Sequence, residues 1–455
     1  MKKFVPFTLA TLLVSSAILG ACGKDEGGAQ SNGSAAPAGS PAASSAAKPS
    51  EPVKLRFWGG VPPESGPQTV IDKWNQANKD IQVEYIRFVN DEQGNTKLDT
   101  ALLSTNDAPD LYVSYSAANV DRRTKAGMAE PLEELMAKAN FNVEEVIGTG
   151  NIMKSGGKIH YLPAAVSPQI VLFNKASLDA VGEKVPTTGW TWDDFAALAK
   201  KMNKPGQYGA FFIPGWEPIA YDMSITAKPT DVYYGDDGLS TFMSLPSFKK
   251  GLELQKSLID AKATYPYAEA ATNKLQPQDE LLNGKAAMVF TGTYLIRYVK
   301  DDKAYPNRNF QVSFAPIPQY ERGTKVNSGG PGDFMSINPK SANKEAAMKF
   351  LAWYLTEGNQ DMIPGGRIPS NKKADMNKIA DQLIGDAGKY FDKESLVSTL
   401  KADVTYRVFS KTTAQPEIRK AFMEEAERYF LNAQSVDKAL ENMKKRADEA
   451  IKAAK

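Results

Sequence analysis

Strands and helices alternate strictly at the start of the folded part of the chain, and this order limits the architecture more than any other feature. The runs VKLRFWGG, IQVEYIRF and APDLYVSYS combine β-branched and aromatic residues with near-alternation, which is typical of strands. Helices are predicted between them, so that the elements follow in the order 53–60, 67–78, 81–88, 96–104 and 108–116. This spacing predicts a parallel sheet with right-handed crossovers.

The same alternation resumes after about residue 164. Strands are predicted for IVLFN, YGAFFI and AAMVF, and helices for 191–202 and 247–260. Thr191 and Asp194 stand three residues apart, which predicts a capping box at the start of a helix whose buried stripe carries Phe195, Leu198 and Met202. Two amphipathic helices are predicted near the end of the chain, with buried faces that carry Ile418, Phe422, Ala426 and Tyr429, and then Leu440, Met443, Ala447 and Ile451. Residues 51–455 are too many for one core, so we expect two or more domains.

The only cysteine of the 455 residues, Cys22, follows a short apolar segment. Lys2 and Lys3 precede an uncharged apolar run, and the small residues Gly20 and Ala21 stand directly before the cysteine. This order is typical of a secretory signal, and it looks like a bacterial lipoprotein signal in which Cys22 is acylated and becomes the new N-terminus. The alternative is an uncleaved membrane helix, because the run approaches the length that spans a bilayer.

Residues 23–50 are mainly Gly, Ser, Ala and Pro, a composition that predicts a flexible tether with a reach on the order of 30 Å. A lipidated Cys22 leaves no thiol for disulfides or for a metal, so we predict no metal site and no cofactor. The formal net charge is +2, with acidic and basic residues interspersed. A nucleic-acid binder would carry a basic stripe instead.

Catalytic motifs are scarce. His160 is the only histidine, and the chain contains no HExxH, G-x-S-x-G or Walker sequence. The glycine-rich NSGGPGDF lacks the Lys-Ser/Thr of a phosphate loop, and GDDG offers too few spaced oxygens for calcium. We therefore expect a protein that is not an enzyme, although a spatial pair of carboxylates for glycoside hydrolysis is invisible in one sequence.

Aromatic residues stand where predicted strands give way to loops. Ligands of open α/β sheets bind beyond the carboxyl ends of the strands, and a flat aromatic face can stack on the C–H side of a sugar ring. The aromatic residues in such positions are Trp58, Tyr115, Trp216 and Tyr294. Trp74 and Trp353 lie at helical spacing and are predicted to be core residues, and Trp190 and Trp192 are predicted to brace a helix start.

Five motifs in order resemble the extracellular solute-binding lipoproteins of ABC importers, in particular the carbohydrate-binding group that includes maltodextrin-binding proteins (family 1 solute-binding proteins). They cover nearly the whole chain from residue 53 to about 450. The motifs are APDLY, GKIHYLPAAVSPQIVLFNK, WTWDDF, LLNGKAAMVFTGTY and ANKEAAMKFLAWYLT.

The resemblance implies an α/β, two-lobe periplasmic-binding-protein-like fold of type II, in which each lobe is a mainly parallel sheet flanked by helices and the ligand binds between the lobes. The chain would cross between lobes near Pro163, return near Lys285 and cross again near Ser336. The implied parts are a signal peptide at 1–21, a lipidated linker at 22–52, a first lobe at 53–163 plus 286–335, and a second lobe at 164–285 plus 336–455.

The resemblance also implies positions for ligand contacts. Ser114 and Tyr115 would line the first lobe, Trp216 and Glu217 the opposite wall, and Gly330 to Asp333 the floor. Further implied contacts are Ser167, Tyr294 in place of a stacking tryptophan, and the hydroxyl partners Glu64 and Arg367. The implied partners are a mono- or oligosaccharide, ABC permease subunits and the extracytoplasmic face of a bacterial membrane, with the protein held there as a monomer by a lipid (palmitate) on Cys22.

Three departures from the family pattern leave the particular sugar open. Phe173 replaces a tyrosine, His160 replaces an aromatic residue, and Ser167 replaces a carboxylate. A binder of amino acids or peptides, a metal binder and a surface glycosidase are the alternatives. An amino-acid binder would depend on a charged group such as Arg367, and a metal binder would need clustered ligands.

Overall fold

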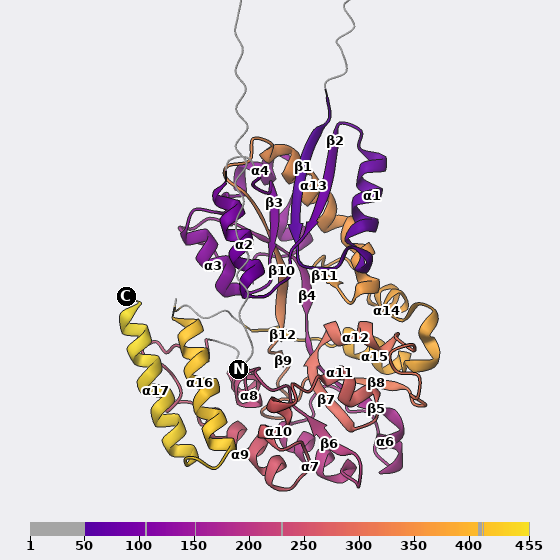
Figure 1. The fold of residues 1–455 in the computed structure, drawn as a ribbon, viewed down its shortest axis with the longest axis vertical. Coiled ribbons are helices and arrows are strands. Elements are labelled where there is room, and N and C mark those ends of the chain that lie inside the picture. The colour runs from indigo at the N-terminus through magenta and orange to yellow at the C-terminus, as the bar shows by residue number, and fades with distance from the viewer. Residues whose placement is uncertain are drawn as a thin grey trace, which may run out of the picture. The chain divides into compact units, whose positions relative to one another are not determined.

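The structure is a computed structural model that describes residues 51–104, 107–150, 152–228, 231–407, 412 and 414–454. Residues Glu51–Lys455 form one compact unit, whose described residues contain a six-stranded and a four-stranded sheet, each flanked by helices (Figure 1), and a short two-stranded ladder. We call the unit's larger sheet with its helices the first lobe, and its four-stranded sheet with its helices the second lobe. The predicted signal peptide, Cys22 and the linker up to residue 50 lie outside the described residues.

The first lobe is built on a six-stranded sheet in the order β11-β4-β10-β3-β1-β2. The strands are β1 (Val53–Gly59), β2 (Ile81–Arg87), β3 (Leu111–Ser114), β4 (Leu162–Ser167), β10 (Gly330–Ile337) and β11 (Ile368–Pro369). β1 pairs in parallel with β2 and β3, as the sequence predicts. The pairings of β10 with β3, of β10 with β4 and of β11 with β4 are antiparallel. The sheet is therefore mixed and not mainly parallel as the resemblance implies, because β10, whose chain enters from the second lobe, runs against both β3 and β4.

Helices cover this sheet. They are η1 (Pro63–Ser65), α1 (Pro67–Ala77), α2 (Glu92–Leu103), α3 (Ala117–Lys125), α4 (Glu133–Lys138), α5 (Val143–Val146), α13 (Lys344–Thr356) and η3 (Gly358–Gly365). The predicted face of α1 is confirmed, since Val70, Ile71 and Trp74 are buried. Trp74 packs edge-on against Phe350 of α13, with the ring centroids 5.3 Å apart.

The second lobe is built on a sheet in the order β6-β7-β5-β8. Its strands are β5 (Gln169–Asn174), β6 (Tyr208–Phe211), β7 (Ala286–Gly292) and β8 (Val312–Pro316). β5 lies antiparallel to β7 and β8, and β6 is parallel to β7. The flanking helices are α6 (Lys175–Ala180), α7 (Trp192–Met202), α8 (Ile219–Ala227), α9 (Pro246–Asp260), α10 (Tyr267–Thr272), α11 (Pro277–Leu282), η2 (Thr293–Leu295), α12 (Ile296–Val299), α14 (Met376–Ile384), η4 (Gly385–Tyr390), α15 (Lys393–Leu400), α16 (Gln415–Phe430) and α17 (Val436–Ala453).

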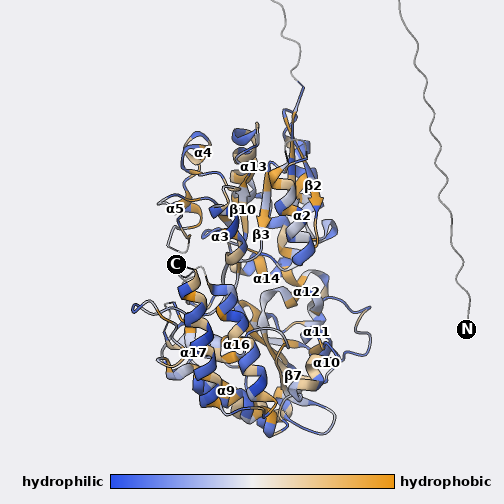
Figure 2. Ribbon diagram, turned by 60° about the vertical axis from the view of Figure 1, so that its left-hand side comes forward, coloured by the Kyte–Doolittle hydropathy of each residue, from blue (hydrophilic) through white to orange (hydrophobic). Residues whose placement is uncertain are grey.

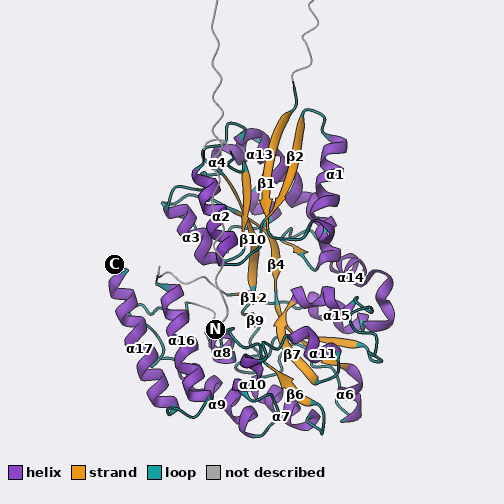
Figure 3. Ribbon diagram, in the orientation of Figure 1, coloured by secondary structure: helices purple, strands orange, loops and turns teal. Residues whose placement is uncertain are grey.

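The predicted capping box of α7 is confirmed. The Thr191 hydroxyl accepts from the Asp194 amide at 3.2 Å, and the Asp194 carboxylate accepts from the Thr191 amide at 2.9 Å. Phe195, Leu198 and Met202 are buried as predicted. The two reciprocal bonds fix where the helix begins, and the helix covers one face of the second sheet (Figure 3).

The predicted lobe boundaries are wrong at two places. Strands β7 and β8, assigned above to the first lobe, pair with β5 of the second sheet. Helix α13, assigned to the second lobe, packs in the core of the first. The chain returns to the first lobe between β9 (Val326–Asn327), which pairs with β12 (Thr405–Tyr406), and β10. Strand pairing joins segments more than a hundred residues apart, and the local pattern of AAMVF does not encode its partner. The first crossing, between β4 and β5, lies close to the predicted point at Pro163.

The C-terminal helices α16 and α17 pack on the second lobe beside α9, and their predicted buried residues are confirmed except for Tyr429, which is only half-buried, whereas the next residue, Phe430, is buried. Ile418 and Phe422 join the cluster that also contains Leu440 and Met443. Charged residues occupy the other faces, so that much of α17 is blue in Figure 2. Among the residues that the structure describes, no helix has both the length and the apolar character needed to cross a bilayer.

Candidate ligand-binding site

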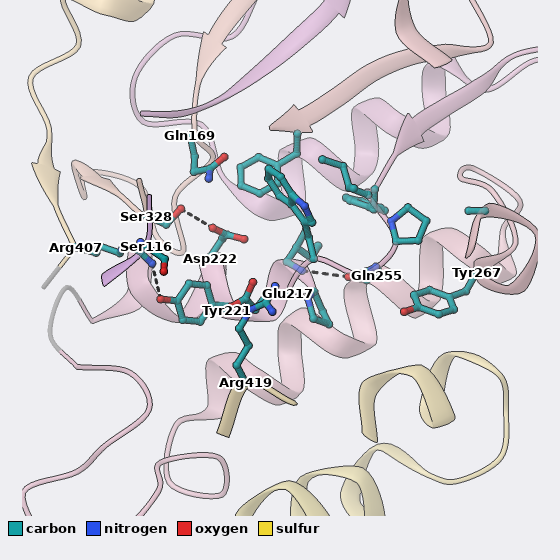
Figure 4. Close-up of a pocket in the computed structure, with 18 of the residues that line it drawn as sticks. Ser116, Gln169, Glu217, Tyr221, Asp222, Gln255, Tyr267, Ser328, Arg407 and Arg419 are labelled. Carbon is teal, nitrogen blue, oxygen red and sulfur yellow. Dashed lines mark hydrogen bonds and ion pairs between the residues drawn. The ribbon is translucent and has the colours of Figure 1, made fainter. Parts of the chain in front are cut away.

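A cavity of about 620 Å³ lies mainly on the second lobe and reaches the first lobe (Figure 4). The loop after β6, the start of α8 and parts of α9, α10 and α16 supply most of its lining. The first lobe contributes residues 115–118, which follow the carboxyl end of β3 and open α3. This volume is in the range of small-molecule sites, and its place at the end of a parallel strand agrees with the predicted position of the ligand.

Trp216 provides an unusually open aromatic surface at this cavity. Its side chain is 45% exposed, although large aromatic side chains are normally covered. The ring of Tyr294, which is half-buried, lies 5.9 Å from the Trp216 ring at an angle of 48°. The structure therefore brings together two of the predicted aromatic residues, one in the lining and the other directly beside it.

The charged groups of the cavity already have partners. Arg419 donates to Glu217 at 2.6 Å, and Arg407 donates to the Tyr221 hydroxyl at 2.7 Å. The hydroxyl of Ser328 donates to Asp222 at 2.5 Å. Each of these groups thus has a hydrogen-bond partner within the lining of the cavity, an arrangement that leaves no strong preference for a charged ligand.

Asp222 has the most perturbed carboxyl group of the cavity. Burial raises its pKa from 3.8 to about 7, the nearby charge of Glu217 adds to the rise, and the Ser328 hydrogen bond and Arg407 oppose it. This carboxyl group therefore exchanges its proton near neutral pH and can act there as a hydrogen-bond donor or as an acceptor.

Gln169 offers a further polar contact. It stands at the start of β5 and lines the cavity, and its backbone amide donates to Asn327 at 2.8 Å. Its side-chain Oε1 has no hydrogen-bond partner within the described parts of the chain. A buried acceptor without a partner costs free energy, so a ligand hydroxyl that donates to this oxygen would remove that cost.

On the first lobe, Tyr115 lines the cavity while its hydroxyl accepts from the Gly60 amide at 2.6 Å. Behind it, Arg367 donates to Asp333 at 2.9 Å, and this partner charge raises the pKa of the Arg367 guanidinium. Asp333 stands in β10 with φ of 47°, in the left-handed region that side chains other than glycine seldom adopt. The structure thus places Asp333 and Arg367 beside the site, in an ion pair with each other, and outside the lining of the cavity.

The remaining predicted residues lie elsewhere. Trp58 is only 5% exposed and packs in a core cluster with Phe88 and Tyr112, because the face of β1 that carries it is covered. Ser114 is buried and accepts from Arg123 at 2.7 Å. Ser167 is exposed at the end of β4 opposite Gly330, and Glu64 is exposed in η1. None of these residues lines the cavity.

Several residues that line the cavity were not predicted from the sequence. Asp222 is an acidic residue within the apolar run IAYDMSI, and this pattern could have drawn attention to it, since buried acids are rare. Arg407, Arg419 and Gln169 carry no local signal. Among the described residues, no group of three or more His, Cys, Asp and Glu side chains is arranged to hold a metal ion.

Comparison with known proteins identifies the family of the chain. It belongs to the family of bacterial extracellular solute-binding proteins, whose model matches residues 60–361. An uncharacterized lipoprotein of Streptomyces antibioticus is 24% identical over 71% of this chain and 72% of its own length.

Two solved structures have the same fold. A sugar transporter of Rhizobium etli in an open conformation superposes with a TM-score of 0.73 at 19% identity, covering 89% of this chain and all (100%) of the other. An ABC substrate-binding protein of Listeria monocytogenes in complex with cycloalternan gives a TM-score of 0.71 at 19% identity, covering 88% and 99%. The predicted family and the two-lobe periplasmic-binding fold of type II are confirmed.

Proposed function

We propose that the protein captures a carbohydrate in this cavity and delivers it to the permease of an ABC importer. The observation that carries the proposal is the half-exposed Trp216 ring beside a cavity rich in hydroxyl, amide and carboxyl groups. Sugars have apolar ring faces and polar edges, so they match a flat aromatic surface next to hydrogen-bonding groups. The paired charges favour an uncharged ligand, and the two solved relatives described above are a sugar transporter and a cycloalternan complex.

In this proposal the ligand binds first to the second lobe, which supplies most of the lining. Closure then brings residues 115–118 of the first lobe onto it. Only contacts that the closed form makes and the open form lacks can shift the balance between them. The permease would recognise the closed form. No covalent step is proposed, so prolonged incubation with oligosaccharides should release no reducing ends.

We also propose that an acyl chain on Cys22 holds the monomeric protein at the outer face of the cell membrane. The signal-like segment before Cys22 supports this assignment, and the uncharacterized relative from Streptomyces antibioticus is named a lipoprotein. Stable anchoring takes more than one acyl chain or a second membrane contact.

A thermal-shift screen tests the ligand class. The panel contains neutral mono- and oligosaccharides, amino acids and short peptides, because a ligand that binds the folded state raises its melting temperature. We expect stabilisation by at least one saccharide. Stabilisation by amino acids or peptides alone would overturn the carbohydrate assignment.

A further inference from the structure

A second hollow of about 670 Å³ adjoins the cavity on the second lobe. It runs between α10 with the loop that follows it on one side and α16 on the other, and we call it the α10–α16 groove. Its lining includes Ala271, Lys274, Gln276, Lys420 and Met423. The cavity and the groove share four lining residues: Pro214, Tyr267, Pro416 and Arg419.

The shared residues form a fixed boundary between the two hollows. Arg419 is held by its 2.6 Å bond to Glu217 of the cavity. Tyr267 rests on Phe430 of α16, with the ring centroids 5.5 Å apart. The two prolines and the tyrosine ring are flat apolar surfaces, and the guanidinium is a fork of donors. A sugar ring can meet such a boundary as it meets the cavity, with its face on the apolar groups and its hydroxyls on the cation.

The groove has the same mixed chemistry beyond this boundary. Leu275 and Met423 supply half-buried apolar surface, and Gln276 supplies an amide. The charged side chains of the rim carry both signs, since Lys274 and Lys420 stand with Glu424 and Glu427. A single-sign rim would favour a charged polymer, whereas this rim suits a hydroxyl-rich, uncharged chain.

We propose that the ligand is an elongated sugar chain, with one end in the cavity beside Trp216 and the other passing over Arg419 into the α10–α16 groove. This inference rests on the proposed function and adds the length of the ligand and its path. A monosaccharide would fill the cavity alone and leave the groove unused. A longer chain gains hydrogen bonds and apolar contacts in the groove, so its affinity should rise with length.

The test measures affinity by calorimetry for two linear series, maltose to maltoheptaose and cellobiose to cellohexaose. In a series that binds, we expect affinity to rise about tenfold from the shortest to the longest member, as one or two added hydrogen bonds would give. Ala271→Trp fills the groove and should abolish the rise while leaving the shortest member bound. Ala268→Trp is the matched control, because Ala268 is exposed on the same helix and lines neither hollow.

A second variant tests the groove without adding a bulky side chain, in case Ala271→Trp does not fold. Lys274→Ala combined with Gln276→Ala truncates two exposed side chains and should reduce the rise severalfold without changing the melting temperature of the free protein. If affinity did not change with chain length, or if Ala271→Trp and Ala268→Trp showed the same dependence of affinity on chain length, the proposed role of the groove would be refuted. The proposed function would not be affected by either result. Failure of every saccharide in the thermal-shift panel would overturn both.

Discussion

Replacing Trp216 by alanine should weaken sugar binding about tenfold and leave folding nearly intact. A tryptophan side chain can bury on the order of 250 Å², and Trp216 is 45% exposed, so roughly 110 Å² remains for a ligand. At about 25 cal/mol per Å², complete cover of this surface is worth about 3 kcal/mol. A sugar ring that covers half of it contributes about 1.5 kcal/mol, which is about a tenfold change in Kd.

The assay is titration calorimetry with the saccharide that stabilises the wild type best, together with urea unfolding of each variant. Trp216→Ala should cost about 1 kcal/mol or less in unfolding free energy, because half of the side chain is already in water. Trp216→Phe keeps a flat ring and should retain most of the affinity. Unchanged affinity in Trp216→Ala would refute the stacking role, and a loss of stability as large as the loss of affinity would show that the ring acts through folding.

Three further predictions test two groups of the site and the proposed lipid anchor. Asp222 has a pKa of about 7 when folded against 3.8 for its ordinary value, so folded protein binds its proton more tightly and the stability that Asp222 contributes falls as pH rises between about 4 and 7. The Asp222→Asn variant should lack this fall, so its free energy of unfolding, measured in urea, should exceed that of the wild type by on the order of a few kcal/mol as the pH rises from 5 to 8. If the free energies of unfolding of the two proteins changed with pH in parallel, the prediction would be contradicted. Tyr294→Ala should lower saccharide affinity by about 1–2 kcal/mol through lost stacking, and an unchanged Kd would remove Tyr294 from the site. Cys22→Ser should abolish labelling by radioactive palmitate in cells and release the protein into the medium, and a labelled variant would place the lipid elsewhere.

Local elements were largely predictable because their signals lie within a few residues of one another. The Thr191–Asp194 box and the faces of α1, α16 and α17 depend on spacings of three and four residues, which the sequence displays directly. The placement of β7 and α13 depends on which distant segments pair, and no local pattern encodes that. The sequence therefore predicts where the helices and strands lie better than it predicts which lobe each of them belongs to.

The same distinction explains the candidate site. Trp58 and Trp216 are both predicted to stand where a strand gives way to a loop, and their local sequences do not separate them. Trp58 lies under a covering cluster that includes Leu98 and Leu102 of α2, whereas the loop that carries Trp216 is open. Arg407 and Arg419 reach the cavity from about 200 residues beyond Trp216 along the chain, so only the fold could reveal them.

The open position of Trp216 also gives the protein an internal optical reporter. The chain has six tryptophans, and four of the others are at most 7% exposed. Trp353 is only partly buried, but it sits against Trp74 in the first lobe. A ligand that lies on the Trp216 indole would displace water from this one fluorophore. The emission of Trp216 should then shift to shorter wavelength, and acrylamide should quench this emission less. Binding could then be followed in real time without a dye, with Trp216→Phe as the silent reference.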